Sequence, residues 1–150
     1  MLEGFIRALI SGYLGAAGFG ALLHAPRKGI VWGAVIGSVG YTAYWLIFHL
    51  IGSELPAMFV GALLAAALGQ IAARKLCMIS TVFITIAILP LVPGIGLYRA
   101  MSAMGQGDMM TGAITAVHAM SLILMIVMGT GIGSALFSLH KTAGPKEEEP

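Results

Sequence analysis

The sequence predicts an all-α integral membrane protein with five transmembrane helices, the fourth of which is broken. Apolar residues make up 59% of the 150 residues and charged residues 9%, against about 45–50% and about 25% in soluble domains. The mean hydropathy is +0.97. A chain this short and this apolar cannot cover a globule with polar surface, so lipid must be its solvent. Its charged residues also separate apolar stretches of about 20 residues, the length a helix needs to cross about 30 Å of hydrocarbon.

These stretches define the predicted helices in chain order. The expected spans are Phe5–His24, Gly29–Ile51, Leu55–Ala73, Cys77–Tyr98 and a part of Met109–Leu139. The last stretch is longer than a membrane requires, so about 20 to 25 of its residues should span. We expect a retained first helix rather than a cleaved leader, because only Arg7 occupies the place of a basic leader region. Residues 1–140 are expected to form the membrane domain, and residues 141–150 a polar cytoplasmic tail.

The basic residues between the helices predict the orientation. Three clusters fall on one side of the membrane: Arg27 and Lys28, Arg74 and Lys75, and Lys141 and Lys146. The opposite side has Glu3, Glu54 and a predicted loop from Arg99 to Asp108 with one basic residue. Because cytoplasmic loops carry the excess of lysine and arginine, the N-terminus is predicted outside and the C-terminus in the cytoplasm.

Small residues recur four positions apart in four of the five predicted helices. The sets are Gly12/Ala16/Gly20, Gly33/Gly37, Gly61/Ala65/Gly69 and Gly129/Gly133. Such spacing forms a groove in which another helix backbone can approach closely. The pattern predicts dense helix packing, either within this chain or against another chain.

The segment ILPLVPGIGLYRAM, residues 88–101, predicts a break in the fourth helix from Pro90 to Gly96. Pro90 and Pro93 have no N–H group to donate, and the glycines permit backbone angles that other residues resist. Irregular backbone at membrane depth persists only where protein buries it or where it lines a water-filled cavity. A proline kink that only shapes packing is the alternative to a functional break.

A broken helix is a recurring device of secondary transporters, in which the restarted half-helix turns free N–H groups and a positive dipole end toward an anionic group. The expected donors are the amides of Gly94, Ile95 and Gly96, just after the break. The expected substrate-binding residues are Pro93, Gly94, Gly96, Tyr98 and Arg99, with Thr81 and Thr85 on the inner approach.

His118 is the candidate proton-coupling residue of the last helix. An ionisable side chain within a membrane span points to function, and imidazole titrates near neutral pH. The alternative is a neutral histidine that is hydrogen-bonded between helices. No paired carboxylates fall clearly inside a span and no Ser/His/Asp arrangement is visible, so an enzyme is not expected. Neither a metal site nor another cofactor is expected, and no nucleic acid partner.

The stretches TVFITIAILPLVPGIGLYRAM and GFGALLHAPRKGIVWGAVIGSVGY, with the five-helix layout, resemble the C-terminal half of the threonine/serine exporter family over about residues 5–135. With five helices, the chain is similar to the split form, the YjjB-like small subunit that works beside a larger subunit. The resemblance implies a bacterial inner-membrane secondary exporter of threonine and serine, or of C4-dicarboxylates such as succinate.

The same resemblance implies a partner, a larger membrane subunit that carries the N-terminal exporter domain. A homo-oligomer in the lipid bilayer is the other assembly expected. The alternative function is a membrane scaffold or assembly subunit that does not transport and whose glycine grooves hold a partner.

Overall fold

The computed structural model describes residues 2–139, which are helical apart from short connections. The helices are α1 (Leu2–Leu22), α2 (Arg27–Ile51), α3 (Glu54–Leu76), α4 (Ser80–Ile88), the 3₁₀ turn η1 (Leu89–Leu91), α5 (Gly94–Gly105) and α6 (Met109–Leu139). The predicted tail, residues 141–150, lies outside the described residues. The all-α prediction is confirmed for the part of the chain that the structure describes.

Four of these helices are long and apolar enough to cross a membrane, namely α1, α2, α3 and α6. The fourth predicted span is instead two helical pieces, residues 80–91 and 94–105, which meet at 51°. The five predicted spans are therefore reached only if this bent pair counts as one span. By its helices, the protein is a multi-pass membrane protein.

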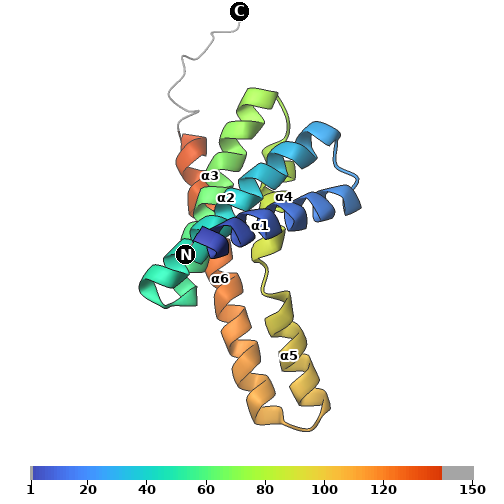
Figure 1. The fold of residues 1–150 in the computed structure, drawn as a ribbon, viewed down its shortest axis with the longest axis vertical. Helices are drawn as coiled ribbons and strands as arrows, with labels where there is room; N and C mark the ends of the chain where they lie inside the picture. Colours follow the sequence, from blue (N-terminus) through green and yellow to red (C-terminus); the bar gives the residue numbers. More distant parts are fainter. Residues whose placement is uncertain (1, 140–150) are drawn as a thin grey trace, which may run out of the picture.

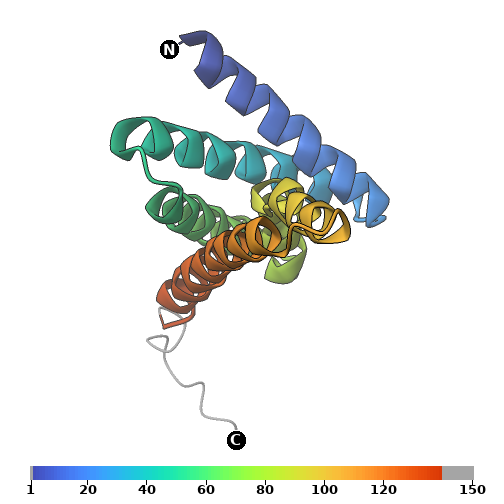
Figure 2. The same ribbon diagram turned by 90° about the horizontal axis from the view of Figure 1, so that it is seen from below.

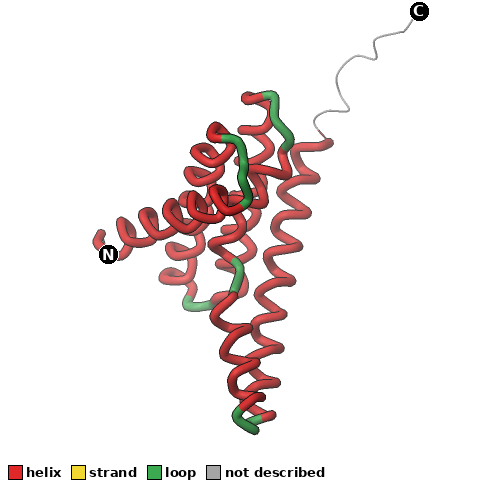
Figure 3. Tube along the Cα trace, turned by 90° about the vertical axis from the view of Figure 1, so that its right-hand side faces the viewer, coloured by secondary structure: helices red, strands yellow, loops and turns green. Residues whose placement is uncertain are grey.

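The helices are arranged as a bundle from which one hairpin projects (Figure 1). Neighbouring helices pack in the order α1, α2, α3, α6, and α4 packs against both α2 and α3 (Figure 2). Helix α5 packs mainly against the N-terminal half of α6, and the two extend beyond the bundle (Figure 3). With 31 residues, α6 is about 46 Å long, so it belongs to both the bundle and the hairpin.

The predicted small-residue grooves pack within the chain. A Cβ added at Gly12 would lie 3.1 Å from the Cα of Ser38, and one at Gly61 would lie 2.9 Å from the carbonyl oxygen of Gly40. A Cβ at Gly37 would lie 2.9 Å from the Cβ of Ala16. Helix α6 approaches α3 in the same way through Gly129 and Gly133. The grooves of α1, α2, α3 and α6 therefore each pack against a neighbouring helix of this chain.

The predicted loop from Arg99 to Asp108 is wrong, because α5 continues to Gly105 and only Gln106–Asp108 connect it to α6. Alanine, methionine and leucine favour helix, and a small-residue contact holds this helix on α6. A Cβ at Gly112 would lie 3.0 Å from the carbonyl oxygen of Ala100.

Asp108 caps the start of α6. The N–H of Thr111 donates to its Oδ1 at 3.1 Å, as expected of an aspartate at a helix N-cap. The side-chain and backbone hydrogen bonds with Thr111 lower the pKa of this carboxyl. Asp108 therefore holds the turn between α5 and α6 in its ionised form.

Gly129 and Gly131 allow the close α3–α6 contact to be tested on one helix. A Cβ at Gly129 would lie 2.5 Å from the carbonyl oxygen of Phe59, whereas one at Gly131 would meet nothing within 4 Å. We expect Gly129→Ala to lower the free energy of unfolding by about 1–3 kcal/mol through overpacking. Gly131→Ala should leave it unchanged or raise it by up to about 1 kcal/mol. Thermal unfolding in detergent measures both, and equal effects would contradict the observed packing.

Candidate functional site

The break between α4 and α5 is a short irregular segment with its own hydrogen bonds. Helix α4 ends at Ile88, and Val92 in the following turn donates its N–H to the carbonyl of Leu89 at 3.3 Å. Helix α5 restarts at Gly94, whose N–H donates to the carbonyl of Val92 at 2.8 Å. One of the three predicted amide donors is therefore engaged. The amides of Ile95 and Gly96 lie in the first turn of α5, where a helix supplies no carbonyl partner of its own.

Protein encloses the irregular backbone on the bundle side. Leu91 is 1% exposed and packs with Met58, Ala62, Leu122 and Ile126 in one core cluster. On another side, Pro90 lies beside α1, with its Cβ 3.8 Å from the position of a Cβ at Gly15. This burial is what a backbone break at membrane depth requires.

A cavity of about 570 Å³ lies against the break. It is lined by Tyr41, Tyr44, Glu54, Met58, Pro90, Leu91, Val92, Pro93, Gly94, Ile95, Gly96, Arg99, Thr115, His118 and Leu122. Its volume falls within the range of about 300–1,000 Å³ typical of small-molecule sites. Met58, Leu91 and Leu122 belong to both the lining and the core cluster, so the inner end of the cavity is closed by the core.

The cavity brings groups of opposite charge together. His118 Nε2 of α6 lies 3.6 Å from Glu54 Oε2 in the first turn of α3, and the two side chains are 57% and 39% exposed. The carboxylate of Glu54 is favoured at this helix N-terminus by the helix dipole. Arg99 contributes a cation from α5. Tyr41 and Tyr44 of α2 add two phenol rings, with centroids 5.8 Å apart.

The structure brings together part of the predicted site. Pro93, Gly94, Gly96, Arg99 and His118 all line this cavity. The other three predicted residues lie elsewhere: Thr81 and Thr85 line a second cavity, and Tyr98 lines neither. In the described part of the chain, no group of three or more histidine, cysteine, aspartate or glutamate residues could hold a metal ion.

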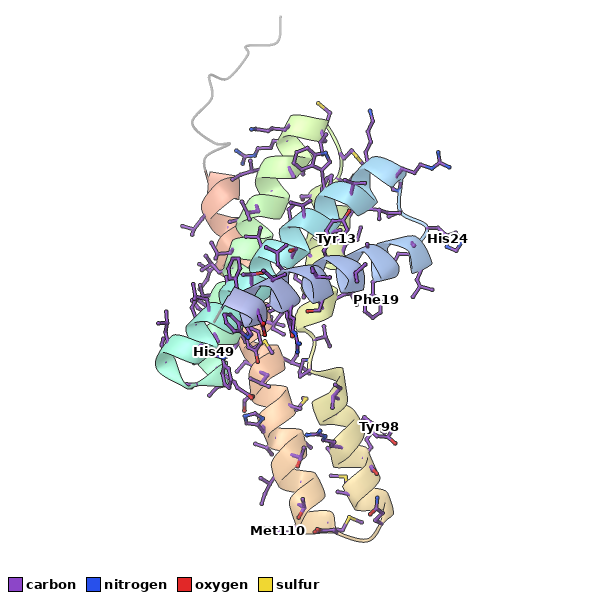
Figure 4. The ribbon with its side chains drawn as sticks, viewed as in Figure 1. Tyr13, Phe19, His24, His49, Tyr98 and Met110 are labelled. Atoms are coloured by element: carbon purple, nitrogen blue, oxygen red, sulfur yellow. The ribbon has the colours of Figure 1, made fainter. Side chains whose placement is uncertain are left out.

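The second cavity lies between the α1–α2 connection and α4. Its volume is about 360 Å³, and Thr81 and Thr85 share its lining with His24 and Pro26. Tyr98 is 72% exposed and points away from α6 on the outer side of α5 (Figure 4). Tyr98 and Arg99 are neighbours, and successive side chains of a helix point about 100° apart. The two residues therefore face different surroundings.

Glu54, Tyr41 and Tyr44 are residues of this cavity that the sequence did not identify as a site. Glu54 was assigned to a loop outside the spans, whereas it begins α3. One available signal was that Glu54 is the only acidic residue between Glu3 and Asp108. No local pattern pairs it with His118, which follows 64 positions later and meets it only through the packing of α3 on α6.

A protein-family model described as "Threonine/Serine exporter, ThrE" matches residues 8–136. The match covers 129 of the 150 residues (from 8 through 136) and includes every residue that lines the cavity at the break. No solved structure matches the chain.

We expect the cavity to hold water, and two positions on α6 can test this. Thr115 lines the cavity, whereas Val117 is 67% exposed and lies outside it. A thiol reacts as the thiolate, which forms only where water reaches it. If the cavity holds water, Thr115→Cys should therefore react with a charged, membrane-impermeant thiol reagent at least about tenfold faster than Val117→Cys, which lies outside the cavity. Both variants need a Cys77→Ser background, because Cys77 is exposed. Equal labelling rates would contradict a water-filled cavity.

Proposed function

The chain belongs to the threonine/serine exporter family, a family of transporters and not of enzymes, and from that premise we propose that it is the smaller membrane subunit of a two-component secondary exporter. Its substrates are small carboxylate-bearing metabolites, either threonine and serine or C4-dicarboxylates such as succinate. The proposed location is the bacterial inner membrane, with the N-terminus outside and the C-terminus in the cytoplasm.

The proposed substrate site is the cavity at the break. Arg99 can hold a carboxylate with two parallel hydrogen bonds, the geometry that a guanidinium favours. The amides of Ile95 and Gly96 can donate to the same group from the N-terminus of α5, where the helix dipole also favours negative charge. Pro93 and Gly94 shape the break that turns these amides to the cavity.

The observation that carries the two-component proposal is the exposure of the Glu54–His118 pair. His118 lies within a candidate span, Met109–Leu136, yet its side chain is 57% exposed. An ionisable side chain is costly to place in hydrocarbon, so water or protein must cover this face. We assign that role to a larger membrane subunit that carries the N-terminal exporter domain. A second copy of this chain is the homo-oligomeric alternative.

In this proposal His118 couples transport to proton movement, since it is a titratable group on the wall of the substrate cavity. Thr81 and Thr85 line the inner approach, because their cavity adjoins the α1–α2 connection, next to Arg27 and Lys28. Tyr98 faces lipid or the partner and does not contact the substrate.

The scaffold alternative is less favoured by the packing. It depended on glycine grooves left open for a partner, and the grooves of α1, α2, α3 and α6 are filled by neighbouring helices of the same chain.

Arg99 gives the direct test of the substrate site. We expect Arg99→Gln to lower efflux of the transported substrate by about 10- to 100-fold, because a charge-assisted hydrogen bond is worth about 1.5–3 kcal/mol. The amount of protein in the membrane should not change. Arg7→Gln is the matched control, since Arg7 lies on α1 and does not line this cavity. Efflux unaffected by Arg99→Gln would refute the site.

The two-component proposal is tested by efflux of labelled threonine and succinate from preloaded cells. The cells express this chain alone, the larger subunit alone, or both together. We expect export only from cells that express both, because the cavity of this chain is open on one side. Export by this chain alone would refute the requirement for a partner.

A further inference from the structure

Glu54 gives the cavity a negative group that a carboxylate substrate alone does not require. It is the only carboxylate among the described residues of the lining. Glu54 belongs to the part of the lining that α2 and α3 form, whereas Arg99 and the first turn of α5 form another part. The lining of one cavity therefore holds both a cationic and an anionic side chain.

We infer that Glu54 binds the ammonium group of the substrate and so selects zwitterionic amino acids over dicarboxylates. This inference rests on the proposed function, in which the cavity at the break is the substrate site. Arg99 and the α5 amides take the carboxylate, and Glu54 takes the ammonium group, which the same molecule carries on the carbon next to the carboxylate.

The surroundings of Glu54 suit a cation. Tyr41 and Tyr44 lie on the same part of the lining, and aromatic faces attract ammonium groups. The imidazole Nε2 of His118 lies 3.6 Å from Oε2 of Glu54. That distance exceeds the 2.7–3.2 Å of a good hydrogen bond, so no direct hydrogen bond to His118 competes with a substrate ammonium for this carboxylate oxygen.

The charge balance of the lining points the same way. The ionisable groups that face the cavity are Glu54 from α3, Arg99 from α5, His118 from α6, and the phenols of Tyr41 and Tyr44 from α2. Among these side chains, Arg99 and Glu54 supply one positive and one negative charge, which match the two charges of a zwitterion. A dicarboxylate would place one of its two charges beside Glu54, where like charges repel at low dielectric.

The test compares two substrates that differ only in the ammonium group. Threonine and 3-hydroxybutyrate share the carboxylate and the hydroxyl, and only threonine carries the cation. Cells express the full chain with its larger subunit, and the measured quantity is the ratio of the two efflux rates. A general loss of folding or assembly lowers both rates together and leaves this ratio unchanged.

We expect the wild-type chain to favour threonine and Glu54→Gln to lower the ratio by about 10- to 100-fold, the value of one charge-assisted hydrogen bond. Glu54→Ser is the second neutral variant, should the glutamine variant fail to accumulate, and the same fall is expected. Glu54→Asp should keep most of the preference. Glu3→Gln is the matched control, because Glu3 lies on α1 and does not line this cavity.

The outcomes separate this inference from the function on which it rests. If the wild-type pair exports neither threonine nor succinate, the proposed function fails and the inference fails with it. If it exports succinate but not threonine, the exporter stands and the role of Glu54 is overturned. A ratio unchanged by both neutral variants also overturns that role, whatever the absolute rates.

Discussion

Hydrocarbon offers no hydrogen-bond partner to a peptide group, and this constraint determines how the centre of the molecule is built. Pro90 and Pro93 cannot donate, so the chain between α4 and α5 must leave the helical pattern. The resulting segment forms short-range hydrogen bonds, and its Leu91 is buried among side chains of α3 and α6. The cavity lies where this enclosure ends. The position of the proposed substrate site thus follows from the need to shield a broken backbone.

The walls of the cavity come from two different parts of the fold. Tyr41, Tyr44 and Glu54 belong to the bundle, whereas Arg99 belongs to the projecting hairpin. His118 lies on α6 near the junction of the two parts, about a turn before the core residue Leu122. A molecule bound by both walls would therefore connect the bundle and the hairpin.

Local features of the sequence predicted the helical membrane class, the approximate spans and the break, because apolar composition and proline affect the backbone locally and do not depend on contacts with distant residues. They did not predict the pair of Glu54 and His118, which depends on the packing of α3 against α6. They also placed Tyr98 beside Arg99 at the site, whereas Arg99 lines the cavity and Tyr98 does not. Small-residue spacing predicted close packing correctly, but only the fold shows that the neighbours lie within the same chain.

The attachment of the hairpin has a mechanical consequence. Helix α5 is held mainly by α6, and α6 is fixed to α3 through Gly129 and Gly133, well beyond the hairpin. The hairpin is therefore attached to the bundle at one end only, at the core cluster around Leu122, and its tip is the turn at Asp108. A small rotation of the hairpin about this attachment, beside the Glu54–His118 pair, would move the turn at Asp108 farther than it moves Arg99, because the turn lies farther from the attachment.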